Sequence, residues 1–170
     1  MIQTPYFTQL QASHQYQGKT NHCGPYCAAI TAKALGAAEA DGLKFAALLN
    51  PVRWKGILPI PQRIPQSATL PWGTTHLLQL LKLNTRWTPF AKEDDLLKNL
   101  QNEVIQIVII GEWRPIWAHY MILAAYDAVQ GFGFIDPACI DSKIHWYKPA
   151  KFLKLWRRYG KNLICVFPGD

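Results

Sequence analysis

The two halves of this sequence carry different hydrophobic patterns, and the change between them limits the folds that the chain can adopt. Apolar, β-rich runs occupy the second half at Val104–Ile110, His119–Asp127, Gly131–Asp136 and Leu163–Phe167. The sequence DAVQG between the second and third runs is typical of a turn, so these runs predict an antiparallel sheet. Helical patterns dominate the first half. Helices followed by an antiparallel sheet indicate an α+β domain.

Five segments are predicted to be helical from their apolar spacing and their end signals. The first begins at Gly24 and ends before Gly36. Thr74 or Thr75 is predicted to cap a later helix. The polar stretch at residues 9–21 is predicted to be a loop. The other predicted helices are 43–50, 75–83, 91–102 and 148–160.

Residues 51–75 contain five of the twelve prolines, at positions 51, 59, 61, 65 and 71. This density of proline excludes a helix interior or a central strand. Ordered loops of this length are often functional. We therefore expect an insertion that covers a cleft or contacts a substrate, with Trp54 and Trp72 as substrate-binding residues. A surface-packed insertion without a binding role is the alternative.

The length of 170 residues suits one domain, which we expect to span residues 1–170. The N-terminus has no basic segment followed by an apolar run, so no signal peptide is predicted. No apolar stretch reaches the roughly 18 residues of a membrane span. Four cysteines without an export signal are expected to be thiols in a reducing cytoplasm.

The net charge of +7 favours anionic partners in general. Lys151, Lys154, Arg157 and Arg158 place much of this charge on the last predicted helix, away from its aromatic residues. No nucleic-acid-binding motif accompanies these side chains, so we expect a solvated helix face and do not predict nucleic acid as a partner.

A cysteine stands at the start of the first predicted helix, in the sequence NHCGPYCAAI (residues 21–30). At this place the unpaired backbone N–H groups and the positive end of the helix dipole favour a thiolate, which is the nucleophilic form. The same N–H groups can stabilise an oxyanion formed when the thiolate attacks a carbonyl. Gly24 leaves room for a substrate backbone. Cys23 is therefore a candidate nucleophile; the alternative is a small buried residue at a helix start.

A thiolate nucleophile needs a base within hydrogen-bonding reach and a third group that orients the base. His119 begins the second apolar run, directly after the sequence WRPIWA, and Asp136 ends the third run. The predicted turn between these runs folds Asp136 back toward His119, so we expect the two side chains to make contact. The alternatives are a histidine held by the backbone and an aspartate that starts a turn before Pro137.

The sequences that carry these residues resemble a known family. CGPYCAAITAKALG, HYMILAAYD and FIDPA, in this order, are similar to the double-glycine-leader cysteine peptidases of the papain superfamily, which include domains that process bacteriocin precursors. PYFTQ and WGTTHLLQLL…DDLLKNLQNEVIQIVII also resemble the stand-alone members. The resemblance covers nearly the whole chain apart from residues 51–75.

This resemblance implies a papain-like α+β fold, in which an N-terminal helix that carries the nucleophile packs on a C-terminal antiparallel sheet. It implies Cys23 as the nucleophile, His119 as the general base and Asp136 as the orienting residue. In this family a glutamine upstream of the cysteine donates to the oxyanion. Gln17 lies six residues before the cysteine, as in transporter-linked members, and we prefer it to Gln9, which lies within PYFTQ as in many stand-alone members.

The predicted function is that of a cysteine peptidase, or a related thiol amidohydrolase, that cleaves a peptide or protein substrate and requires no cofactor. The same residues could serve acyl transfer or deamidation, and an inactive papain-like binding module is the other alternative. Cys23 and Cys27 form a C-x3-C pair beside His22, and a zinc site would need two further ligands, for which His119 and His145 are candidates. C-x3-C alone is a weak signal, so no metal site is predicted. The sequence leaves the substrate and the oligomeric state open.

Overall fold

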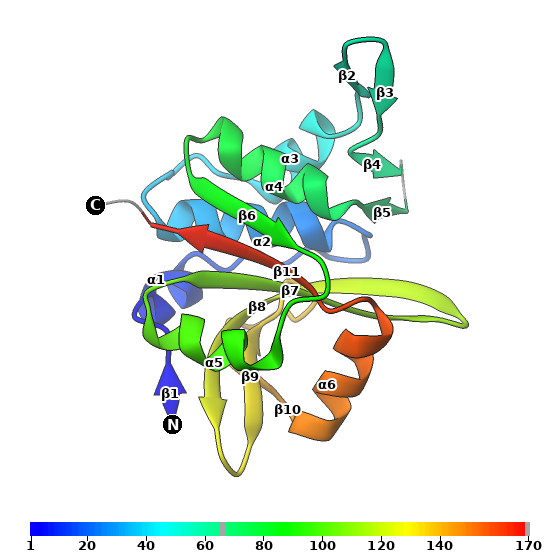
Figure 1. The fold of residues 1–170 in the computed structure, drawn as a ribbon. Helices are drawn as coiled ribbons and strands as arrows, with labels where there is room; N and C mark the ends of the chain where they lie inside the picture. The colour runs from blue at the N-terminus through cyan, green and yellow to red at the C-terminus, as the bar shows by residue number, and fades with distance from the viewer. Residues whose placement is uncertain (65–66, 169–170) are drawn as a thin grey trace.

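An antiparallel sheet forms the centre of the computed structural model, which describes residues 1–64 and 67–168 (Figure 1). Within these residues the sheet has seven strands. In order across the sheet they are β10 (His145–Tyr147), β9 (Gly131–Ile135), β8 (Ile116–Asp127), β7 (Ile105–Trp113), β11 (Asn162–Phe167) and β6 (Asn84–Thr88), with β1 (Ile2–Gln3) paired to β8. The turn predicted from DAVQG joins β8 to β9, as expected.

Helices cover both faces of this sheet (Figure 1). The helices are α1 (Phe7–Ala12), α2 (Cys23–Ala34), α3 (Gly42–Leu48), α4 (Pro71–Leu80), α5 (Glu93–Gln101) and α6 (Pro149–Arg158). Side chains of α2, α3 and α4 form one apolar core with the sheet, and those of α5 and α6 form a second core on its other face. Strand β7 supplies Ile107 and Ile109 to the first core, and Val108 and Ile110 to the second. Burial on both faces explains why residues 105–110 of this strand are apolar, with the exception of Gln106.

The predicted α+β arrangement is confirmed, but several local expectations are wrong. Residues 9–21 are not entirely loop, because α1 occupies their first part and buries Leu10. The cap expected at Thr74 or Thr75 lies inside α4, which begins at Pro71. Proline suits the first turn of a helix because its missing N–H would have no partner there. The edge strands β6 and β10 were not predicted.

The Pro-rich insertion forms two small hairpins apart from the central sheet (Figure 1). One pairs β2 (Arg53–Lys55) with β3 (Leu58–Ile60), and the other pairs β4 (Arg63–Ile64) with β5 (Ala68–Thr69). None of the described prolines of this segment lies in the central sheet or in a helix interior, as predicted, although residues 71–75 form the start of α4. Pro65, which is one of the five prolines of this segment, and Gln66 lie outside the described residues.

The second hairpin is fixed to the helices by buried contacts. Arg63 is buried, and its Nη1 donates a hydrogen bond to the carbonyl oxygen of Ala46 in α3 (3.2 Å). The backbone N–H of Leu70 donates to the carbonyl oxygen of Gln62 (3.0 Å). The same carbonyl lies directly against Gly73 of α4. The insertion therefore packs on α3 and α4 at defined points.

We expect Gly73→Ala to destabilise the protein. A Cβ at this position would lie 2.3 Å from the carbonyl oxygen of Gln62, which is backbone and cannot move aside cheaply. Alanine is the better helix former by about 1 kcal/mol, but overpacking of this kind costs about 1–3 kcal/mol, so the clash should prevail. Chemical denaturation measures the effect. Gln79→Ala, on the exposed face of the same helix, should change the free energy of unfolding by less than about 0.5 kcal/mol. Equal stability of the two variants would contradict this packing.

Candidate active site

Cys23 is the first residue of α2, as the sequence predicts. Its side chain is almost buried, with 8% of its surface exposed. The helix has no side-chain cap at His22, so the first backbone N–H groups of α2 are not satisfied by a capping side chain. These groups and the helix dipole place positive potential around the Cys23 sulfur. This position can stabilise an oxyanion formed beside the sulfur.

His119 and Asp136 come together through the pairing of β8 with β9. Ile122 is the register partner of Ile135, so the two strands bring the residue after β9 close to His119. His119 Nε2 donates a hydrogen bond to Asp136 Oδ1 at 2.7 Å. The backbone N–H of Ala138 donates to the same oxygen at 2.8 Å. The expected contact between the two side chains is therefore present. His119 is the fourth residue of β8 rather than its first, because pairing with β7 extends toward the hairpin tip.

The charges of these groups depend on one another. Burial disfavours a charged His119, but its hydrogen bonds with Asp136 and Cys23, and the negative charges of these partners, raise the pKa of His119 to about 10. Burial also disfavours a charged Asp136, yet the hydrogen bond from His119 and its positive charge lower the pKa of this carboxyl. At neutral pH an imidazolium thus lies between a carboxylate and the Cys23 sulfur.

A cavity of about 390 Å³ opens at Cys23 and His119. Three parts of the chain form its wall: the second hairpin of the insertion, the first residues of β8, and the loop before α2. Tyr159, which directly follows α6, also reaches it. The lining residues are Gln17, Asn21, Cys23, Ile64, Ser67, Ala68, Thr69, Leu70, Pro71, Ile116, Trp117, Ala118, His119, Tyr120 and Tyr159.

The two candidate glutamines differ in position. Gln17 is buried and lines the cavity, where its Nε2 donates a hydrogen bond to the carbonyl oxygen of Thr20 (3.0 Å). Its backbone N–H donates to the carbonyl oxygen of Pro137 (2.9 Å), which ties it to the loop that follows Asp136. Gln9 is exposed on α1 and is absent from the cavity wall. The structure thus brings Gln17, but not Gln9, to Cys23.

None of the three residues expected to bind substrate is among those that line this cavity. A Cβ at Gly24 would meet Thr74 and Thr69 within about 3 Å, so the glycine permits packing of the insertion on α2 and does not face the cavity. Trp54 is exposed on the first hairpin. Trp72 donates from Nε1 to the carbonyl oxygen of Pro61 (2.7 Å) and packs on Trp87. The insertion does reach the cavity, but with Ile64 and residues 67–71.

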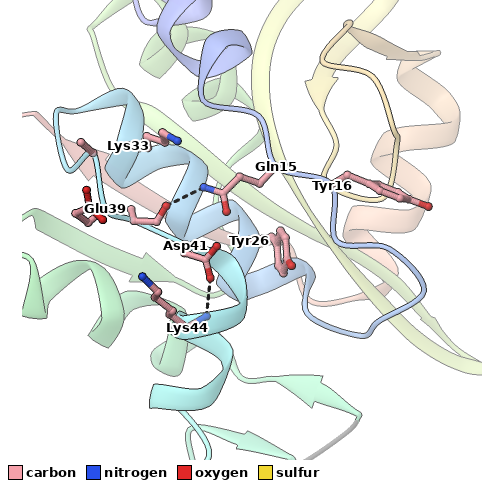
Figure 2. A pocket seen from close by; sticks show the side chains of 9 residues that line it. Gln15, Tyr16, Tyr26, Lys33, Glu39, Asp41 and Lys44 are labelled. Atoms are coloured by element: carbon pink, nitrogen blue, oxygen red, sulfur yellow. Dashed lines mark hydrogen bonds between the residues drawn. The ribbon is translucent and has the colours of Figure 1, made fainter.

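The described residues also line hollows outside this cavity. One, of about 660 Å³, lies beyond His119 and Asp136 and includes Trp117 and Lys151. Another, of about 480 Å³, is shown in Figure 2 and lies between the ends of α2 and α3. There Gln15 donates to the carbonyl oxygen of Ala40, and Asp41 accepts from the backbone N–H of Lys44. These side chains support the local backbone and offer no nucleophile.

The structure shows neither a metal-binding cluster nor a membrane-spanning helix within residues 1–64 and 67–168. Among these residues, no group of three or more His, Cys, Asp or Glu side chains is arranged to hold a metal ion. Within the same described ranges, every helix is too short or too polar to cross a bilayer.

Sequence comparison gives no match, either with models of known protein families or with curated protein sequences. Comparison with solved structures does give matches. The chain has the mixed helix and antiparallel-sheet fold of the papain-type, C39-like cysteine peptidases, so the predicted fold class is confirmed. One similar structure is the crystal structure of a candidate C39-like peptidase from Bacillus anthracis. It is 13% identical to this chain with a TM-score of 0.68, and the match covers 88% of this chain and 90% of that chain.

Proposed function

We propose that this protein is a cysteine peptidase in which Cys23 is the nucleophile, His119 the general base and acid, and Asp136 the group that orients His119. The observation that carries this proposal is the hydrogen bond from His119 to Asp136 beside Cys23, with His119 and Cys23 both at the wall of one cavity. The C39-like peptidase fold supports it. We further propose that residues 1–170 form one peptidase domain, with residues 51–75 as an insertion beside the cleft.

In the proposed reaction, the Cys23 thiolate attacks the carbonyl carbon of a peptide bond, and the carbonyl oxygen becomes an oxyanion. A backbone N–H at the start of α2 and the second N–H of the Gln17 amide would donate to this oxyanion. Collapse of the intermediate breaks the C–N bond, and His119 gives its proton to the leaving amine. Water, activated by the neutral His119, then hydrolyses the thioester and restores the thiol. The four cysteines are free, which fits a reducing compartment such as the cytoplasm.

Alkylation with iodoacetamide as a function of pH tests this proposal. In this reaction the thiolate displaces iodide and forms a thioether. Cys23 should react rapidly well below pH 8, because the charged His119 stabilises its thiolate. The other thiols should not react in this range, because burial raises the pKa of Cys27, Cys139 and Cys165. Mass spectrometry of digested protein identifies the labelled cysteine.

Two variants serve as controls for this experiment. Cys23→Ser should remove the fast labelling, and His119→Ala should slow it and move it to higher pH. If Cys23 instead reacts like an ordinary thiol, or does not react, the site has no activated nucleophile. The protein would then be a binding module on a peptidase fold, and the proposed function would be wrong.

A further inference from the structure

The cavity at Cys23 has a mixed lining that includes several large apolar side chains. The insertion contributes Ile64 and Leu70, β8 contributes Ile116 and Trp117, and Tyr159 also lines the cavity. Ile64 and Ile116 remain 51% and 72% exposed, although both are large aliphatic side chains. Covering such surface with an apolar ligand group is favourable because it removes the surface from water. The wall therefore has exposed apolar side chains, in the same cavity as Cys23, that a ligand could cover.

The cavity wall also lacks charged groups other than the proposed catalytic pair. None of its described residues is Asp, Glu, Lys or Arg, and its neutral polar members include Asn21, Ser67 and Thr69. A charged substrate side chain that enters here would lose its hydration without gaining an oppositely charged partner from the wall. The charge of Arg63 does act on Cys23, but this side chain is buried, does not line the cavity and donates to the carbonyl oxygen of Ala46. The volume of about 390 Å³ is within the range of pockets that enclose a ligand group, and glycine would leave it largely empty.

We propose that this cavity binds a bulky apolar side chain of the substrate, adjacent to the bond that is cleaved, and that the insertion determines this preference through Ile64 and Leu70. The inference rests on the proposed peptidase function. It gives the insertion a role in choosing the substrate, because two of the apolar contacts come from the second hairpin. It also distinguishes this cleft from one that selects a pair of glycines.

Affinity labelling with dipeptide reagents tests the preference directly. The reagents are acetyl-dipeptidyl chloromethyl ketones with glycine at one position and Phe, Lys, Glu or Gly at the other, in both orders. The Cys23 thiolate displaces chloride and forms a thioether, so turnover is not needed. One of the two Phe reagents should label Cys23 at least about tenfold faster than the Gly-Gly, Lys or Glu reagents, the scale that one apolar group gives in a fitting pocket.

Ile64→Glu places a carboxylate at the rim of the cavity. It should raise the ratio of the Lys rate to the Phe rate by about tenfold or more, because the lysine ammonium gains a partner at short range. Ile57→Glu is the matched control, since Ile57 lies between β2 and β3, is 90% exposed and does not line the cavity. It should leave the ratio unchanged. The ratio is measured within each variant, so a general loss of reactivity cancels.

The outcomes separate this inference from the function on which it rests. Fast iodoacetamide labelling, together with equal rates for all dipeptide reagents, would overturn the apolar preference and leave the peptidase proposal standing. Preference for the Gly-Gly reagent, or the same ratio in Ile64→Glu and Ile57→Glu, would also overturn it. Absence of activated labelling by iodoacetamide would overturn both, because no thiolate would then act in the cleft.

Discussion

Cys23→Ala is expected to abolish the hydrolysis of p-nitrophenyl acetate, with a loss of about a thousandfold or more. This small ester is a suitable substrate because it carries no amino-acid side chain that would have to bind in the apolar cavity. The wild-type thiolate should take the acetyl group and release p-nitrophenolate, after which water hydrolyses the thioester. Release of p-nitrophenolate, followed by absorbance in a stopped-flow instrument, should show a rapid first turnover and then a slower steady rate.

Cys27→Ala is the matched control, since it makes the same change one turn later in α2. Cys27 is fully buried, and this burial raises its pKa well above the ordinary value, so it is not expected to act as a nucleophile. This variant should keep the rapid first turnover. If Cys23→Ala kept it as well, or if Cys27→Ala lost it while remaining folded, the assignment of Cys23 as nucleophile would fail.

The residues of the proposed triad could be placed from the sequence because local rules position the elements that carry them. Cys23 precedes a proline in a clear helix start, and this fixes it at the head of α2. His119 lies on β8 and Asp136 directly follows β9, and a short turn joins these two strands. The helix start and the turn depend on neighbouring residues, which the sequence displays. The register does not: pairing continued from the turn would place Asp136 opposite Ile122, and the register shift between Leu123 and Ala125 brings it to the face of His119.

The cavity wall could not be predicted in the same way, because it depends on packing between distant segments. Trp72 and Pro71 are neighbours, yet only Pro71 lines the cavity, because the ring of Trp72 packs on Trp87 of β6. Gly24 was expected to admit a substrate, but Thr69, which lies 45 positions away, takes up that space. A Pro-rich composition indicates an insertion, but it does not show which side chains turn toward the cleft.

The edge strands β6 and β10 could not be predicted from the sequence for a related reason. Strand β6 has the sequence NTRWT, in which Asn84 and Arg86 are exposed while Thr85 is buried. This short polar strand lies at the end of the sheet, and its pairing with β11 is decided by packing with α4 and not by its own composition. Propensity for strand formation depends on such surroundings. The central strands, which are buried on both faces, carry the stronger signal.

Asp136→Asn is expected to lower the rate of Cys23 alkylation at pH 6–7 and to shift its pH profile to higher pH. The carboxylate of Asp136 helps to hold the pKa of His119 near 10, although burial acts against the charged imidazole. Without the carboxylate, the pKa of His119 should fall. The neutral imidazole with a neutral thiol then becomes more favourable relative to the imidazolium–thiolate pair. Turnover of p-nitrophenyl acetate should decrease by about a hundredfold or more, because His119 also loses its orientation.

The same ion pair should affect stability, with a sign that follows from the two shifts. His119 has a raised pKa, so its contribution is fully present below about pH 6.5 and is lost as the pH rises through about 10. Asp136 has a lowered pKa, so its contribution is present above the ordinary carboxyl value of 3.8 and is lost as the pH falls below it. Asp136→Asn should therefore reduce the free energy of unfolding most between the two ordinary pKa values, 3.8 and 6.5, and less as the pH rises toward 10.

Asp141→Asn is the matched control for this substitution. His145 Nε2 donates to Asp141 Oδ1 at 3.1 Å, so the same change breaks a second histidine–aspartate pair, which is exposed and does not line the Cys23 cavity. Alkylation of Cys23 and its pH profile should remain as in the wild type. If the two variants behaved alike, the loss in Asp136→Asn would reflect a general effect of removing a carboxylate. If only Asp136→Asn changed the profile, the effect would belong to His119 and to the charge that Asp136 maintains on it.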